Sequence, residues 1–400
     1  MFEKLAARLR TSDIDYRLLI PLLLSTTVVQ MATAMIRITT SYRAIELNLS
    51  IVWLGVIAAV FALFPIGIAV AVGRFIDRGH DALTAWIGAA VFLIASIGFA
   101  TFASPAALLI ATAVMGAGHL CLMASQQMLC VRAAGVGGME RVFGNYMVAG
   151  AIGQGAGPYL VGWIGGAATV PPTQLLFTIG AALAAVSFAV VLTMRPHRKP
   201  PQVADAAEVV PVGELLRVPG LVSVIVAGIV MVASSDIIVI YVPLLGAERK
   251  IDVADIGLLL TVRAAASMIA RLFYPRMVEA VGRFPLMIAS SFACAASFAA
   301  LAMPLPLFWM HVVMLVMGFS FGLATTLSIT IVVDMTAANA RGTANSLRIM
   351  GNRLGQFALP VCAGLAAAAA GISGLLLICA AAIAASAAAM HWRRPVPPDE

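Results

Sequence analysis

Charged residues are scarce in this sequence. Asp, Glu, Lys and Arg together make up 11% of its 400 residues, whereas 62% are hydrophobic. A water-soluble domain usually carries about 25% charged residues. A soluble fold with so little charge could not cover its own surface, which excludes an ordinary soluble globular protein. We therefore expect lipid to solvate most of the chain.

Cysteine is scarce too. The five cysteines are odd in number, lie in apolar segments and form no CxxC pair, so we interpret them as core residues rather than disulfides or metal ligands. The sequence shows no Walker loop, no Ser/His/Asp set and no metal-ligand spacing. We therefore expect neither an enzyme nor a nucleotide-driven pump, and no cofactor or metal.

The apolar residues are gathered into runs of about 20, the length of a helix that crosses a bilayer. Strands of a membrane barrel would be shorter and would alternate in polarity. The sequence therefore predicts an all-α membrane protein with twelve transmembrane helices. The predicted spans are residues 18–40, 51–72, 83–103, 106–131, 142–164, 174–194, 219–243, 255–274, 285–303, 307–333, 343–366 and 372–390.

Basic residues indicate the orientation. The net charge of +7 is spread over short segments between the apolar runs, rather than along one face, so we expect no nucleic-acid partner. Most of these residues fall on the side that holds both termini, which predicts cytoplasmic termini in a bacterial inner membrane. The first sixteen residues are polar and charged, so no cleavable signal peptide is expected. The opposite side is expected to hold Arg37, Arg43, Arg249 and Lys250.

The two halves of the chain can be aligned by one constant shift in residue number, which we call the repeat shift. It carries Gly55 onto Gly257, Gly153-Gln154 onto Gly355-Gln356, and Pro158 onto Pro360. We interpret this as a duplicated six-helix unit. The longest polar stretch separates the copies, which predicts two pseudo-symmetric six-helix bundles, residues 1–194 and 219–400, joined by a cytoplasmic linker at 195–218.

A charged turn follows the second predicted span, with Gly73, Asp77 and Arg78 at fixed spacing. It resembles the loop signature of the major facilitator superfamily, Gly-x-x-x-Asp-Arg-x-Gly-Arg, although Gly79-His80-Asp81 replaces the later Gly-Arg. The second-half copy contains Arg276, Glu279 and Gly282-Arg283. A solvated turn would also explain these charges. The resemblance implies the superfamily's fold and a cytoplasmic gate, for which we select Asp77, Arg78, Arg141, Arg276 and Glu279.

The fifth span contains glycines at close spacing up to Gly157-Pro158, which ordinary helix packing would also favour. It is similar to the Gly-x-x-x-Gly-Pro signature of the efflux and antiporter branches of that superfamily. In its drug/proton antiporters an Arg usually lies four residues before a glycine of the fourth span. Here Thr112 precedes Gly116 at that spacing, which puts proton antiport in doubt.

Ionisable residues within a span are costly and are functional candidates by default. Asp236 and Arg263 lie at matching depths in neighbouring spans, which predicts a pair that serves either coupling or helix packing. Arg353 lies about 18 Å along its helix from Arg341, near the middle of the bilayer. We expect it to face a central cavity and bind an anionic solute. Its expected neighbours are Asn352, Gln126, Tyr146 and His119.

These features favour a secondary active transporter that moves a small organic solute by alternating access, with efflux as the leading direction. Uptake of an organic anion is the alternative, and a membrane receptor or scaffold that does not transport is a third. The repeat argues against a scaffold, which has no need of pseudo-symmetric halves. Protons are a candidate coupling ion, and we expect a monomer in the lipid bilayer.

Overall fold

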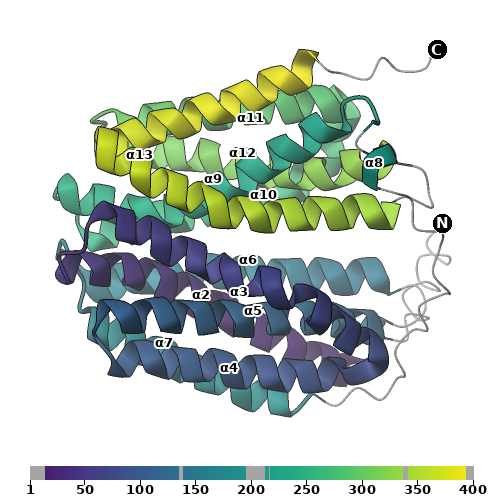
Figure 1. The fold of residues 1–400 in the computed structure, drawn as a ribbon, viewed down its shortest axis with the longest axis horizontal. Helices are drawn as coiled ribbons and strands as arrows, with labels where there is room; N and C mark the ends of the chain where they lie inside the picture. The colour runs from purple at the N-terminus through teal and green to yellow at the C-terminus, as the bar shows by residue number, and fades with distance from the viewer. Residues whose placement is uncertain (1–13, 135–137, 195–211, 216, 337–340, 393–400) are drawn as a thin grey trace, which may run out of the picture.

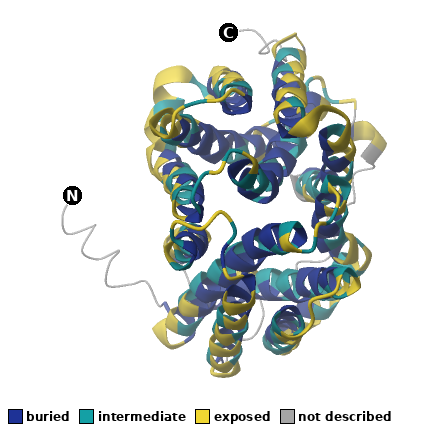
Figure 2. Ribbon diagram, turned by 90° about the vertical axis from the view of Figure 1, so that its left-hand side faces the viewer, coloured by how far each residue is buried: buried dark blue, intermediate teal, exposed yellow. Residues whose placement is uncertain are grey.

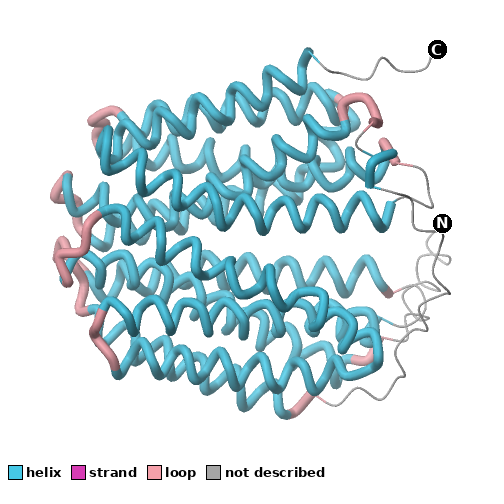
Figure 3. Tube along the Cα trace, viewed as in Figure 1, coloured by secondary structure: helices cyan, strands magenta, loops and turns pink. Residues whose placement is uncertain are grey.

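The computed structural model describes residues 14–134, 138–194, 212–215, 217–336 and 341–392. Within these ranges the regular structure is helical and contains no strand (Figure 3). The first described helix begins directly after its N-terminal capping residue. Asp15 precedes it, and its carboxylate accepts hydrogen bonds from the backbone N–H groups of Arg17 and Leu18, at 3.1 and 3.3 Å.

The long helices gather into two bundles that follow the order of the chain (Figure 1). The first bundle contains α2 (Tyr16–Glu46), α3 (Ile51–Phe75), α4 (Asp81–Thr101), α5 (Pro105–Ala134), α6 (Met139–Gly165) and α7 (Thr173–Leu192). The second contains α9 (Leu221–Glu248), α10 (Val253–Val281), α11 (Arg283–Ala302), α12 (Leu307–Asp334) and α13 (Arg341–Trp392). The short helix α8 (Val212–Leu215) belongs to the predicted linker, most of which lies outside the described residues.

Nine helical stretches among the described residues are long and apolar enough to cross a membrane. Two of these, Ile51–Thr101 and Thr343–Trp392, have 51 and 50 residues and each contains one glycine with positive φ. Gly79 (φ 90°) reverses the chain in the short turn η1 (Ile76–His80), and Gly371 (φ 71°) divides α13. Glycine adopts such φ values freely, so the chain can turn at these two positions. Each stretch is then long enough for two crossings of about 20 residues. The predicted all-α architecture is confirmed, and with α6, a further helix of 27 residues, the described helices are compatible with twelve spans.

The outer surface of the bundles is apolar. Large side chains such as Ile94, Ile110 and Leu272 are 64–66% exposed, while the buried residues face the interior (Figure 2). An apolar surface that extends around the molecule would aggregate in water, so it marks the lipid-facing side of a multi-pass membrane protein.

The two bundles repeat the same internal contacts at the repeat shift. A Cβ atom on Gly116 would lie 2.2 Å from the carbonyl oxygen of Phe61, and one on Gly318 would lie 2.1 Å from that of Arg263. The four residues form two pairs at that shift, and both contacts bring helix backbones together. The repeat therefore sets how the helices pack, and not only the order of residues.

The bundles close on each other at the end away from the described termini. Gly162 on α6 faces Gly257 on α10, and a Cβ on Gly257 would lie 2.7 Å from the Cα of Gly162. The pseudo-symmetric contact joins Gly55 on α3 to Gly364 on α13. In addition, the backbone N–H of Val253 donates to the carbonyl of Ala168 at 2.9 Å. These backbone contacts leave no room for solute at this end.

Candidate functional site

A cavity of about 220 Å³ lies where the bundles face each other. Its walls come from α2, α3, α5 and α6 of the first bundle and from α9, α10 and α13 of the second. The polar residues that line it are Gln30, Thr33, Arg37, His119, Gln154, Ser235, Asp236, Arg263, Arg353 and Gln356.

A continuous chain of polar contacts crosses the cavity. Arg37 Nη1 on α2 donates to Asp236 Oδ1 on α9 at 2.8 Å, which joins the two bundles. The other carboxylate oxygen accepts from Gln356 Nε2 at 3.0 Å. The amide oxygen of Gln356 in turn accepts from Arg353 Nη1 at 3.2 Å. Arg353 therefore lines the central cavity and has a neutral hydrogen-bond partner.

The expected pair of Asp236 and Arg263 differs in the structure. The ion-pair partner of Asp236 is Arg37, and Arg263 Nη1 instead donates to the hydroxyl of Ser235 at 3.0 Å. The guanidinium of Arg263 also lies 5.9 Å from the centroid of the Phe321 ring, within the range of cation–π attraction. Arg37 was expected outside the membrane, but α2 continues past the predicted end at residue 40 to Glu46 and so carries Arg37 inward.

Positive charge predominates in this cavity. Three guanidinium groups line it, and among the described lining residues Asp236 supplies the one carboxylate. Because Asp236 is occupied by Arg37 and Gln356, the nearest hydrogen-bond partners of Arg263 and Arg353 are neutral. Uncompensated cations are costly away from bulk water, so the charge balance of this cavity is unusual for a site at membrane depth.

Several lining residues were missed by sequence reasoning, although the repeat contained a signal for them. Gln154 and Gln356 are equivalent at the repeat shift, and both line the cavity. Both belong to the motif Gly-Gln-x-x-x-Pro, which occurs once in each half of the chain. Thr33 and Ser235 form another such pair. Polar residues at equivalent positions of the two copies therefore mark this cavity better than residues adjacent to Arg353 in the sequence do.

The predicted neighbours of Arg353 divide into two groups. His119 lines the cavity, where its Nε2 lies 3.2 Å from Gln30 Oε1 and its ring lies 5.6 Å from that of Phe61. The other three are not among the lining residues. Gln126 is buried and donates to Ser25 of α2 at 3.1 Å, Tyr146 packs against Met123, and Asn352 is half-buried on α13.

The depth of a residue in the membrane does not determine which side of its helix it occupies. Gln126 lies two turns beyond His119 on α5, where α2 covers the helix. Asn352 precedes Arg353, and neighbouring residues of a helix point in directions about 100° apart. Which side of each helix faces the cavity depends on packing against other helices, which a hydropathy pattern does not contain.

The predicted gate residues all lie at the end that holds the termini. Asp77, Arg78, Arg141, Arg276 and Glu279 are exposed, and within the described part of the chain none of them forms an ion pair. The closing contacts between the bundles are at the opposite end. A latch made by these residues therefore remains a prediction for the opposite state of the protein.

A different acid in the same turn is buried. Asp81, the first residue of α4, pairs with Arg132 near the end of α5, with Oδ2 and Nε 2.6 Å apart. Both side chains are almost fully buried, at 1% and 6% exposed. Arg132 also donates to the carbonyl of Gly79 at 3.3 Å, which fixes the turn where φ is positive. The charge that holds this turn is thus Asp81 rather than Asp77.

Breaking this buried pair should strongly destabilise the protein. Asp81→Asn removes the carboxylate from a buried ion pair, and we expect a loss of about 3–5 kcal/mol. Asp77→Asn, an exposed change four residues earlier, should stay within about 0.5 kcal/mol. Thermal unfolding of both purified variants in detergent would check this. Equal unfolding temperatures would contradict the assigned role of Asp81.

The sequence and the fold both resemble those of known membrane transporters. The sequence matches the Major Facilitator Superfamily over residues 22–249 and again over 224–400. No curated protein matches it. Among solved structures it resembles a variant of the nucleoside transporter NupG (TM-score 0.80, 16% identity, 94% of this chain and 100% of that one). It is also similar to a D-xylose-proton symporter (TM-score 0.77, 16% identity, 95% and 98%).

A third structure broadens the comparison without changing its outcome. A bacterial homologue of the human lysosomal transporter Spinster, in an inward-facing and occupied conformation, has a TM-score of 0.75 at 15% identity and covers 94% of this chain and 96% of its own. At such identities these likenesses describe the fold, whereas the sequence match spans nearly the whole chain. This protein belongs to the major facilitator superfamily of membrane transporters and is not an enzyme.

Proposed function

We propose that this protein is a secondary active transporter that carries a small organic anion through the central cavity by alternating access. The observation that carries the proposal is the excess of guanidinium over carboxylate groups on the cavity wall. Arginine binds carboxylate and phosphate oxygens through two parallel N–H bonds, which gives both affinity and orientation. The pseudo-symmetric closing contacts support alternation between two states.

Efflux from the bacterial cytoplasm is the proposed direction, with both termini on the cytoplasmic side of the inner membrane. The glycine-proline stretch of α6 supports it by its likeness to efflux branches of the family. In that orientation the structure is closed towards the outside. Asp236 is the candidate proton carrier, because protonation of its carboxylate would release Arg37 and loosen a link between the bundles.

Uptake of an organic anion is the second candidate direction. Thr112 lies where drug/proton antiporters of the family usually have an arginine, and its hydroxyl donates to the carbonyl of Leu108 on its own helix. That position therefore offers no titratable group for proton antiport. Inverted membrane vesicles with an imposed pH gradient distinguish the directions, since efflux should accumulate labelled anion inside such vesicles and uptake should not.

The anion preference is tested with pairs of ligands that differ in charge but hardly in size. We expect benzoate and succinate to raise the unfolding temperature of the purified protein, and benzamide and succinamide to leave it unchanged. A ligand present at 100 times its dissociation constant stabilises the folded protein by about 2.7 kcal/mol, a change that a thermal unfolding assay detects. Counterflow of the labelled anion in proteoliposomes then shows transport. Equal stabilisation by the amides would overturn the proposal.

A further inference from the structure

The central cavity holds two positive charges in excess. Among its described lining residues, the guanidinium groups of Arg37, Arg263 and Arg353 face one carboxylate, that of Asp236. Arg37 and Asp236 form a salt bridge at 2.8 Å, which accounts for one charge of each sign. The charges of Arg263 and Arg353 remain. Because ions are costly at membrane depth unless they are paired, a ligand with one negative charge would compensate only half of this excess.

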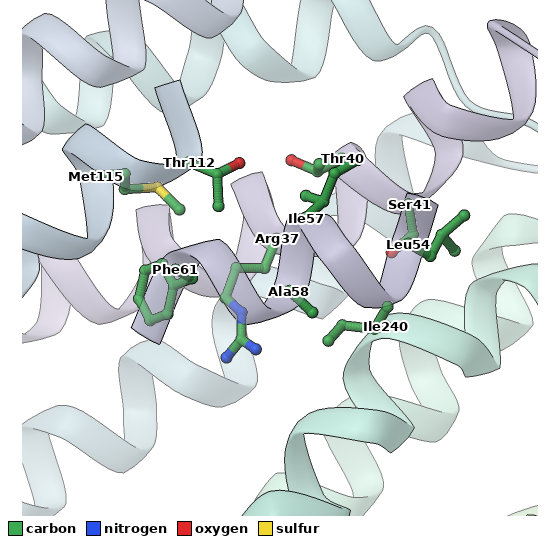
Figure 4. Close-up of a pocket in the computed structure, with 10 residues that line it drawn as sticks. All are labelled: Arg37, Thr40, Ser41, Leu54, Ile57, Ala58, Phe61, Thr112, Met115 and Ile240. Carbon is green, nitrogen blue, oxygen red and sulfur yellow. The ribbon is translucent and has the colours of Figure 1, made fainter. Parts of the chain in front are cut away.

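Arg37 is already held on two sides. Besides its bond to Asp236, its guanidinium lies 5.0 Å from the centroid of the Phe61 ring. Figure 4 shows its side chain beside Phe61, extending away from Thr40 and Thr112. The apolar space that these residues border has a volume of about 20 Å³, which is room for about one water molecule. A solute is therefore confined to the central cavity and to the other two arginines.

Arg263 and Arg353 each keep donors for a solute. A guanidinium has five N–H donors. One Nη1 donates to the Ser235 hydroxyl at 3.0 Å, and the other to the Gln356 amide oxygen at 3.2 Å. In addition, the Nε atom of Arg263 is buried and has no hydrogen-bond partner within the described structure. Buried donors are rarely left unpaired, so this N–H group indicates a binding position for an acceptor atom.

The two arginines stand at opposite ends of one chain of contacts. Ser235, the partner of Arg263, directly precedes Asp236 on α9. Gln356, the partner of Arg353, donates to the Asp236 carboxylate at 3.0 Å. The two guanidinium groups thus share no hydrogen-bond partner. A compact anion at one of them would leave the other unpaired, whereas two acidic groups joined by a short chain can meet both.

We propose that the transported anion carries two separate acidic groups, one bound at Arg263 and one at Arg353, as in a short-chain dicarboxylate. This rests on the proposed transport of an organic anion and adds the number and the separation of its charges. The cavity of about 220 Å³ has the volume of about seven water molecules, enough for a dicarboxylate of about four to six carbons. Such a ligand compensates both free charges and leaves the pair of Arg37 and Asp236 intact.

Succinate and succinamate test the proposal, because they are alike in size and succinamate has an amide in place of one carboxylate. We expect the purified protein to bind succinate about 10- to 100-fold more tightly, the effect typical of one hydrogen bond to a charged group. Malonate, glutarate and adipate then measure the separation, and affinity should pass through a maximum along this series. Sulfate, a compact dianion, should bind no more tightly than succinamate.

Arg263→Gln and Arg353→Gln each remove one of the two guanidinium groups. In either variant the ratio of succinate affinity to succinamate affinity should fall to near one, because one carboxylate is then bound in both ligands. Arg271→Gln on α10 and Arg348→Gln on α13 are the matched controls and should keep the parent ratio, since neither residue is among those lining the cavity. The ratio reports on folded protein alone, so a loss of stability does not imitate its fall.

Equal affinity of the parent for succinate and succinamate would overturn the assignment of two charges while leaving anion binding intact. So would a ratio like that of the parent in both Arg263→Gln and Arg353→Gln. If sulfate bound as tightly as succinate, the separate positions of the two acidic groups would be wrong. If benzoate, succinate and succinamate all failed to bind, the proposed function itself would fail.

Discussion

Arg353→Ala should lower the affinity for the transported anion by about 10- to 100-fold, in line with the 1.5–3 kcal/mol typical of a hydrogen bond to a charged group. The guanidinium lines the cavity, and one of its N–H groups is held by Gln356. The remaining N–H donors can bind a solute, because no carboxylate is hydrogen-bonded to this side chain in the described structure. Binding and counterflow of a labelled anion would measure the loss.

The conservative substitution Arg353→Lys separates the effect of the positive charge from the effect of the hydrogen-bonding geometry. Arg353→Lys keeps the positive charge but cannot make two parallel bonds to one carboxylate, so we expect an intermediate loss. Arg348→Ala is the matched control on the same helix, because Arg348 bonds to Asn345 and is not among the cavity-lining residues. If Arg353→Ala transported anions at the parent rate, Arg353 would have no role in binding.

Gly257→Ala should reduce transport at least 10-fold by preventing closure of the end away from the termini. The new Cβ would lie 2.5 Å from the carbonyl oxygen of Pro158 and 2.7 Å from the Cα of Gly162, and neither backbone atom can turn aside. Alanine favours a helix by about 1 kcal/mol over glycine, so each bundle should fold normally. The closed state would therefore lose population to the state that is open at this end.

A thiol reagent that cannot cross the membrane reports how much of the protein is in the state that is open at this end. Ser41→Cys places a thiol on α2 near the closed end, in a Cys362→Ser background because Cys362 is exposed. Gly257→Ala should raise the labelling rate from outside, and Gly55→Ala, at the pseudo-symmetric contact, should do the same. Gly67→Ala is the control, since nothing lies within 4 Å of its new Cβ. Unchanged labelling and transport in Gly257→Ala would show that this contact does not close the protein.

The hydrophobic pattern was sufficient to predict the twelve spans and their order. A run of about 20 apolar residues has few alternatives to a membrane helix, because each backbone N–H and C=O must be paired within lipid. The repeat shift likewise indicated two similar bundles, and contacts such as Gly116 with Phe61 and Gly318 with Arg263 recur at that shift. Such patterns depend on local sequence and on duplication, both of which can be read along the chain.

The candidate site was predicted only in part. The depth of Arg353 follows from the helical rise of about 1.5 Å per residue. Asp236 lines the same cavity and is linked to Arg353 through Gln356, which depth along the helices does not predict. The hydrogen bond of Arg353 to Gln356 could have been suspected from a spacing of three residues on one helix. Arg37 was misplaced because the end of α2 was set by hydropathy alone, whereas the helix continues with polar residues packed inside the bundle.

The sequence by itself therefore determined that this chain is a duplicated helical membrane transporter with arginines at membrane depth. Only the tertiary structure decided which of its polar groups meet. Arg37 and Asp236 are 199 residues apart, on helices of different bundles, and their 2.8 Å contact depends on how α2 and α9 are rotated about their axes. That rotation is set by side-chain packing among many helices at once, while hydropathy records only how deep each residue lies.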